Sequence, residues 1–172
     1  MNKRGFTLLE LTLVIFLIGL MLSLSMPRLG NFLFHSDLKS VARSMKSVVY
    51  LLRSKSISTN AYTVLHFDLD NNLYWGSYAK PTKESETSLE SAPIVSRIKL
   101  PEGIRFLDAS NINSPRQKFG VLTSTFNPKG MLEETILHLA DRDENLMTII
   151  INAYTGSFML YEEYVDVEYG KE

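Results

Sequence analysis

The sequence predicts an α+β protein in which one long N-terminal helix packs on antiparallel β-sheet. Three observations lead to this prediction: an apolar run over residues 6–26, an amphipathic helical pattern behind it, and period-two strand patterns from Ala61 onward. The chain has 172 residues, 45% hydrophobic and 22% charged, which is enough for one membrane segment and one compact domain.

The N-terminal element is a short basic leader, residues 1–5, followed by the apolar run over residues 6–26. At about 1.5 Å per residue, a helix of this length spans roughly 30 Å, which is sufficient to cross a bilayer. Lys3 and Arg4 precede the run and only Arg28 follows it closely, so we expect a single-pass helix with a cytoplasmic N-terminus.

Glu10 is the unusual residue of this run. A carboxylate in hydrocarbon costs roughly 2.5–3.5 kcal/mol on insertion scales, so Glu10 needs a partner. An ordinary secretory signal cleaved near Ser23-Leu24-Ser25 and a plain single-pass anchor are the alternative interpretations. Neither gives Glu10 a role.

The second element is an amphipathic helix within residues 27–60. Apolar residues recur at spacings of three and four, with basic residues between them: Leu38, Val41, Ala42, Met45, Val48, Val49 and Leu52. Pro27 predicts a kink in a continuous helix, and two separate helices are the alternative. Residues 54–60 are expected to end the helix.

The remaining residues, 61–172, are predicted to form a β-rich domain. The expected strands are 62–67, 73–78, 94–100, 104–107, 119–126, 135–140, 146–153 and 157–161. Residues 80–93 are expected to be a polar loop, and residues 108–118 an exposed loop that carries Arg116 and Lys118.

Few residues predict chemistry. Asp68-Leu69-Asp70-Asn71-Asn72 has part of the oxygen pattern of a calcium loop, but Asp and Asn are also the usual residues of a turn between strands. The segment with Asp141, Asp143, Glu144 and Asn145 is interpreted in the same way. His35, His66 and His138 are far apart in sequence, and the chain has no cysteine and no phosphate-binding glycine loop. We therefore predict no catalytic site, no metal site and no cofactor.

The charge pattern argues against a nucleic-acid partner. Residues 1–60 contain eight Lys or Arg and two Asp or Glu, whereas residues 61–172 contain ten and seventeen. The acidic end, residues 162–172, would repel phosphate. It is expected to be a solvated chain end, with a contact of Tyr164 and Tyr169 to another subunit as the alternative.

The segment Lys3-Arg4-Gly5-Phe6-Thr7-Leu8-Leu9-Glu10-Leu11, with its apolar continuation and Pro27, closely resembles the class III signal of type IV pilins and type II secretion pseudopilins. The resemblance implies that a prepilin peptidase cleaves between Gly5 and Phe6 and methylates the new amine of Phe6. It also implies that Glu10 neutralises the Phe6 amine of a neighbouring subunit in a filament.

Further motifs look like those of type II secretion system protein H and related minor pilins: Arg53-Ser54, Leu100-Pro101-Glu102-Gly103-Ile104, Phe126-Asn127-Pro128-Lys129-Gly130 and Thr148-Ile149-Ile150-Ile151 with Thr155-Gly156-Ser157-Phe158. This implies a minor pseudopilin in the bacterial inner membrane, with a periplasmic domain, that assembles with major and minor pseudopilins and takes part in protein export. The alternatives are a minor pilin of a type IV pilus, acting in initiation, adhesion or DNA uptake, and a membrane-anchored periplasmic enzyme.

Overall fold

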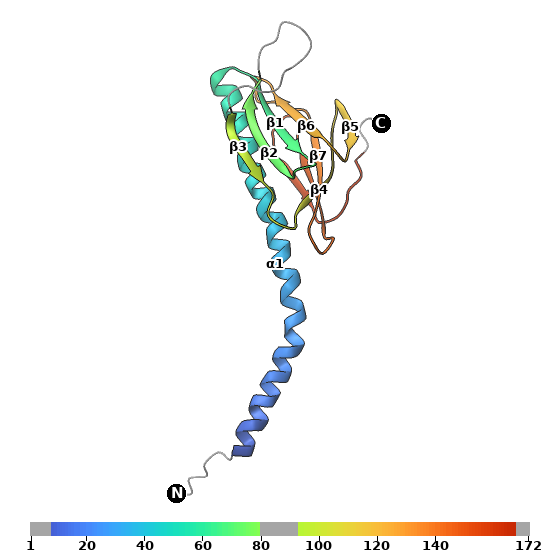
Figure 1. The fold of residues 1–172 in the computed structure, drawn as a ribbon. Helices are drawn as coiled ribbons and strands as arrows, with labels where there is room; N and C mark the ends of the chain where they lie inside the picture. Colours follow the sequence, from blue (N-terminus) through green and yellow to red (C-terminus); the bar gives the residue numbers. More distant parts are fainter. Residues whose placement is uncertain (1–7, 80–92, 168–172) are drawn as a thin grey trace. The chain divides into compact units, whose positions relative to one another are not determined.

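The computed structural model describes residues 8–79 and 93–167, with the helical backbone alone for residues 22–37. The chain divides into two compact units, Met1–Ser36 and Asp37–Glu172. The helix α1 (Leu8–Thr59) contributes to both of them (Figure 1). The kink predicted at Pro27 and residues 80–92 of the loop predicted at 80–93 lie outside the residues that are fully described, so both stay predictions, whereas Pro93 belongs to a strand, β3 (Pro93–Lys99).

The part of α1 in the second unit buries the predicted stripe. All seven residues of the stripe, from Leu38 to Leu52, are buried, while Arg43 and Lys46 between them are exposed. The helix ends in a turn in which Asn60 adopts a left-handed conformation (φ 49°). The Asn60 N–H donates to the Ile57 carbonyl and the Ala61 N–H to the Ser56 carbonyl, which satisfies the last carbonyls of the helix.

Nine strands form two antiparallel sheets in the described residues. The first has the order β3-β2-β1-β6 and the second the order β5-β4-β7-β8-β9. Their bounds are β1 Thr63–Asp68, β2 Leu73–Tyr78, β3 Pro93–Lys99, β4 Arg105–Asn111, β5 Ser114–Gln117, β6 Val121–Phe126, β7 Thr135–Ala140, β8 Leu146–Ile151 and β9 Phe158–Tyr161. The α+β prediction is confirmed, since one helix packs on antiparallel sheets.

The predicted loop at 108–118 is wrong. Strand β4 extends to Asn111 and pairs with β5, in the register Ala109 with Gln117 and Asn111 with Ser114. Strand β5 is a short polar edge strand that contains Pro115, a residue tolerated in sheets mainly at edges. Residues 114–117 therefore form a strand because they pair with β4, and not because their own sequence has a strand pattern.

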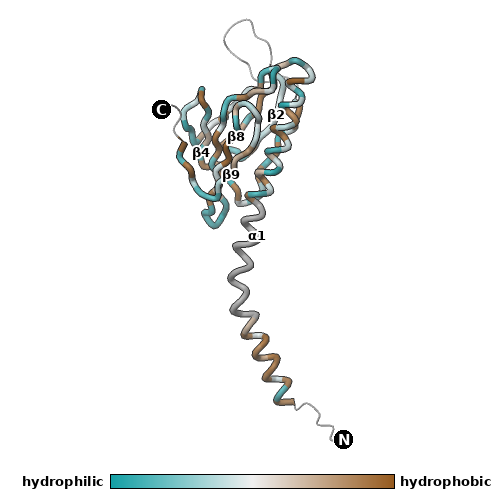
Figure 2. The backbone as a smooth tube through the Cα atoms, turned by 180° about the vertical axis from the view of Figure 1, so that it is seen from behind, coloured by the Kyte–Doolittle hydropathy of each residue, from teal (hydrophilic) through white to brown (hydrophobic). Residues whose placement is uncertain are grey.

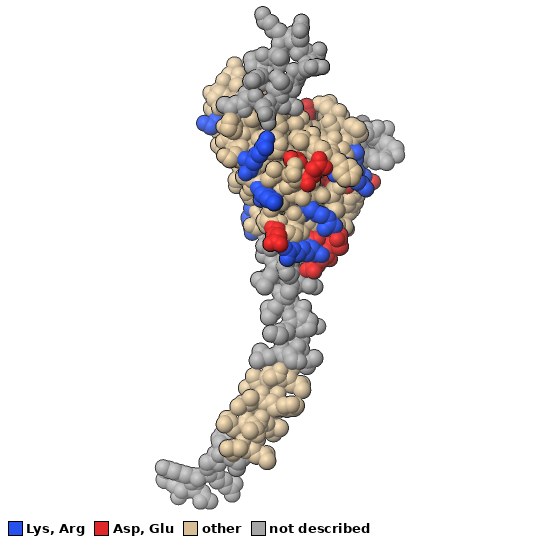
Figure 3. Space-filling model, in the orientation of Figure 1, with Lys and Arg blue, Asp and Glu red and all other residues tan. Residues whose placement is uncertain are grey.

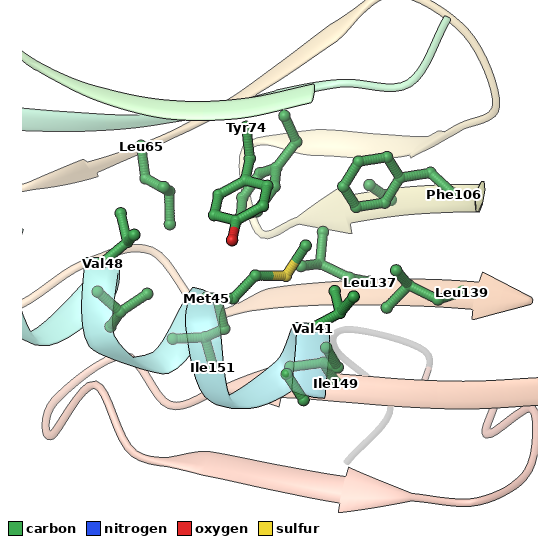
Figure 4. Packing of buried hydrophobic residues seen from close by; sticks show 14 of the residues in the cluster. Val41, Met45, Val48, Leu65, Tyr74, Phe106, Leu137, Leu139, Ile149 and Ile151 are labelled. Carbon is green, nitrogen blue, oxygen red and sulfur yellow. The ribbon is translucent and has the colours of Figure 1, made fainter. Parts of the chain in front are cut away.

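The core lies between α1 and the two sheets. Figure 4 shows Val41, Met45 and Val48 of the helix pointing toward side chains of both sheets. Leu65 and Tyr74 come from the first sheet, whereas Leu137, Leu139, Ile149 and Ile151 come from the second. Gly76 allows the close approach of helix and strand, because a Cβ at this position would lie 2.5 Å from Leu52 Cδ2. Helix and sheets thus share one core.

Candidate functional site

Glu10 lies on the first turn of α1, where the helix dipole favours a negative charge. It is the one ionisable side chain among residues 8–21. The apolar side chains around it are exposed on every side of the helix; Leu8 is 82% exposed, Phe16 66% and Met21 69%. Figure 2 shows this segment almost uniformly hydrophobic, and Figure 3 shows a surface without basic side chains on the visible face.

A helix that is apolar all round buries itself in lipid or against other helices. In either environment the carboxylate of Glu10 requires a positive or hydrogen-bonding partner. Gly5 and Phe6 lie outside the described residues, so the cleavage site and the methylated amine stay predictions. Over the ranges that are described, no helical stretch has the length and mean hydropathy that membrane crossing requires.

The two acidic segments form turns. The Asp68 carboxylate accepts hydrogen bonds from the Asn71 backbone N–H and side-chain amide, each at 2.9 Å, and the Asp70 carboxylate accepts from the Gly120 N–H at 3.0 Å. Asp141 accepts from the N–H groups of Asp143 and Asn145 in the same manner. Burial alone would raise the pKa of Asp68, but the hydrogen bonds from Asn71 outweigh it and lower the pKa.

The carboxylates of Asp68 and Asp141 accept turn hydrogen bonds, as the turn interpretation predicts, whereas Asp70 bonds a backbone N–H that is distant in sequence. Within residues 8–79 and 93–167, no group of three His, Asp or Glu side chains is placed to hold a metal ion.

Two histidines are buried in the sheets. His66 is stacked on Trp75 with a ring-centroid distance of 4.7 Å, and its Nε2 lies 2.9 Å from Ser77 Oγ. Arg97 lies over the other member of this stack, Trp75, at 4.9 Å from the ring centroid. This stack links the strands β1, β2 and β3 through His66, Trp75 and Arg97.

The second buried histidine is the centre of a cluster that sequence reasoning missed. His138 Nδ1 lies 2.7 Å from Asp108 Oδ1, and both residues are at least 97% buried, with exposed fractions of 1% and 3%. The Tyr164 hydroxyl donates to Asp108 Oδ2 at 2.9 Å, and the Tyr164 ring stacks on His138 at 3.8 Å. Arg116 forms an ion pair with Asp166. The pairing of β4 with β7, which places Asp108 opposite His138, creates this cluster.

The electrostatics of the cluster follow from its contacts. Burial raises the pKa of Tyr164, and its hydrogen bond to Asp108 adds to the rise. The hydrogen bond from Arg116 lowers the pKa of Asp166 and raises that of Arg116 itself. The predicted chain end is exposed at Glu163 and Asp166, but residues 163–166 are not frayed, because hydrogen bonds and an ion pair attach them to the second sheet. Residues 168–172, with Tyr169, lie outside the described residues.

Arg116 and Lys118 are exposed, as predicted, but the Arg116 guanidinium is engaged with acidic partners. Its Nε lies 3.5 Å from Asp108 Oδ1, in addition to the pair with Asp166. On the face visible in Figure 3, basic and acidic side chains are interspersed. This surface lacks the single-sign cluster that phosphate binding favours.

Comparisons with known proteins agree with the fold and the N-terminal pattern. The prokaryotic N-terminal methylation motif matches residues 1–26. Two structures of the minor pseudopilin EpsH from the type 2 secretion system of Vibrio cholerae are similar, with TM-scores of 0.50 and 0.52 at 14% identity. They cover 73% of this chain and 97% and 96% of their own. No curated protein matches the chain.

The type IV minor pilin FimU of Pseudomonas aeruginosa is similar to the same degree. Its TM-score is 0.50 at 14% identity, over 76% of this chain and 92% of FimU. These likenesses show a pilin-like fold. The chain thus combines a pilin-like fold with the prokaryotic N-terminal methylation motif at residues 1–26.

Proposed function

We propose that this protein is a minor pseudopilin, a non-catalytic subunit of the periplasmic filament of a type II secretion system. The observation that carries the proposal is Glu10, a single carboxylate on the first turn of an all-round apolar helix and inside the methylation motif. The likeness of the fold to EpsH supports this branch of the superfamily. In this role the protein takes part in the export of folded proteins across the outer membrane.

The N-terminal residues supply the anchor and the processing signal. A prepilin peptidase cleaves between Gly5 and Phe6 and methylates Phe6. Residues 6–26 hold the subunit in the inner membrane, and the second unit, Asp37–Glu172, lies in the periplasm. The other partners are major and minor pseudopilins.

Glu10 acts in assembly because a bundle of such helices removes it from water. A carboxylate buried without a partner is expensive, whereas one paired with the methylated amine of Phe6 on a neighbouring subunit is neutralised. The same pairing penalises a helix that docks in the wrong register, because the charge would then be left unpaired. The exposed apolar side chains of residues 8–21 supply the rest of the contact.

The experiment compares Glu10→Ala and Glu10→Gln with the wild type in cells that contain prepilin peptidase. We expect Glu10→Ala to insert and to be cleaved, because removing an acid makes the segment more apolar, but to be lost from co-purification with other pseudopilins. Glu10→Gln keeps the shape and some hydrogen bonding, so its recruitment should be intermediate. Thr12→Ala is the matched control, since Thr12 is exposed on the same segment and donates to the Leu9 carbonyl. Wild-type recruitment of Glu10→Ala would contradict the assignment.

A minor pilin of a type IV pilus is the second candidate, favoured by the likeness to FimU. Deleting the gene separates the two functions. Loss of secreted folded proteins with normal surface pili supports the pseudopilin, whereas loss of pili with normal secretion supports the pilin.

A further inference from the structure

The segment 162–167, which we name the strap, crosses the outer face of the second sheet. Thr148 Oγ1 of β8 donates to the Glu163 carbonyl at 2.7 Å and accepts from the Val165 N–H at 2.9 Å. His138 Nε2 of β7 lies 3.0 Å from the Val165 carbonyl oxygen, and Tyr164 reaches Asp108 of β4. Asp108, His138 and Thr148 are neighbours in the strand register, so the strap follows one cross-strand row.

The strap lies over a face that is buried without belonging to the core. All six residues of β7 are buried. Leu137 and Leu139 belong to the core cluster, whereas His138, on the other face of the strand, does not. An outer face that is this well covered implies that the strap is part of the folded domain. Its attachment depends mainly on polar contacts, which are sensitive to protonation.

The hydrogen-bond partners of His138 indicate which of its ring nitrogens carry protons. The Val165 carbonyl oxygen can only accept a hydrogen bond, so Nε2 must carry a proton to make the 3.0 Å contact. Asp108 Oδ2 accepts from the Tyr164 hydroxyl, and Arg116 Nε lies 3.5 Å from Asp108 Oδ1, so both carboxyl oxygens face hydrogen-bond donors. An ionised carboxylate can only accept as well, and therefore Nδ1 must carry a proton. Both contacts are made together only by the imidazolium.

Other ionisable groups lie around the ring. They are Asp108 from β4, Arg116 from β5, and Tyr164 and Asp166 from the strap, while β8 contributes the neutral Thr148. Arg105 and Lys118 line the same groove as Asp108 and Tyr164. The pKa of Tyr164 is raised and that of Asp166 is lowered, so both pKa values move further from neutral pH. Histidine is the side chain whose charge ordinarily changes between pH 5 and 8.

We propose that the strap is a proton-controlled latch: it is docked while His138 carries protons on both ring nitrogens, and it detaches when His138 loses one. A neutral ring that keeps the Nδ1 proton toward Asp108 presents a lone pair to the Val165 carbonyl oxygen. This contact turns from a hydrogen bond into a repulsion between two acceptors. Detachment would uncover the row of Asp108, His138 and Thr148 on the outer face of the sheet.

The test places one spin label on the strap of the full chain in lipid nanodiscs. The chain has no cysteine, so Glu163→Cys gives a unique site, and the exposed Glu163 side chain is not needed for the backbone contact to Thr148. Label mobility is followed by electron paramagnetic resonance between about pH 5.5 and pH 8.5. Ser96→Cys on the exposed side of β3 reports any general effect of pH on the domain.

We expect the ratio of mobile to docked label at position 163 to rise with pH, by at most about tenfold per pH unit for one proton, while the label at position 96 stays unchanged. His138→Gln should abolish the pH step, because a glutamine does not titrate. His66→Gln, which alters the other buried histidine, should keep it. A strap label with equal mobility across the range, or a pH step that persists in His138→Gln, would overturn the proposal.

Discussion

Removing the helix residues 37–52 should prevent the β-sheets from folding. These residues place six large apolar side chains in the core: Leu38, Val41, Met45, Val48, Val49 and Leu52, each at most 6% exposed. At about 1.5–3 kcal/mol for each buried side chain, the loss is roughly 9–18 kcal/mol. The whole stability of a domain is only about 5–15 kcal/mol. We therefore expect the fragment 53–172 to aggregate or to remain unfolded.

The matched control is the fragment 37–172, which keeps the complete second unit and should be soluble and folded. Circular dichroism gives the secondary structure of the two fragments, size-exclusion chromatography gives their association state, and thermal melting gives their cooperativity. If the fragment 53–172 were monomeric and melted at the same temperature as the fragment 37–172, the helix would not be part of the core and the reasoning would be refuted.

Three further predictions concern processing, packing and pH. Intact mass of the protein from cells with prepilin peptidase should correspond to a chain that begins at methylated Phe6; an uncut chain would contradict the processing signal. Met45→Ala should lower the free energy of unfolding by about 2–5 kcal/mol in a denaturant titration, whereas the exposed Arg43→Ala should change it by about 0.5 kcal/mol or less. Burial and the bond to Asp108 raise the pKa of Tyr164, so its stabilisation is present below its ordinary pKa of about 10 and is lost as the pH rises through the raised value. In a His138→Gln background, where the strap has no pH step, the difference in melting temperature caused by Tyr164→Phe should therefore shrink above about pH 10, and a constant difference would argue against this role.

The fold could be predicted from the sequence where the hydrophobic periodicity is strong. The helical stripe from Leu38 to Leu52 is buried as predicted, and the strands predicted at 73–78 and 135–140 have the observed bounds. Strand β5 could not be predicted, because Ser114–Gln117 has no alternating pattern and includes Pro115. Its pairing depends on β4, which is a tertiary effect that local propensity does not contain.

The cluster around His138 could be predicted from the sequence only in part. A histidine inside the otherwise apolar strand 135–140 already indicates a buried polar group that needs a partner. The identity of that partner depends on the register between β4 and β7. The partner, Asp108, is 30 residues from His138 in the sequence. The acidic composition of residues 162–172 predicts a solvated end for Tyr164 and Asp166. It does not reveal that the fold places His138 beside Tyr164 and Arg116 beside Asp166.

The position of α1 in the second unit has a mechanical consequence. Its side chains contact both sheets through one core, and it is further tied to them by the hydrogen bond between Ser44 and Tyr74 and by Arg53 Nε, which donates to the Gly130 carbonyl. Tension applied along residues 37–59 would load all of these contacts in shear at the same time. The domain should then resist pulling as one body and yield in a single step, so a force transmitted through the helix would reach both sheets before either could peel away.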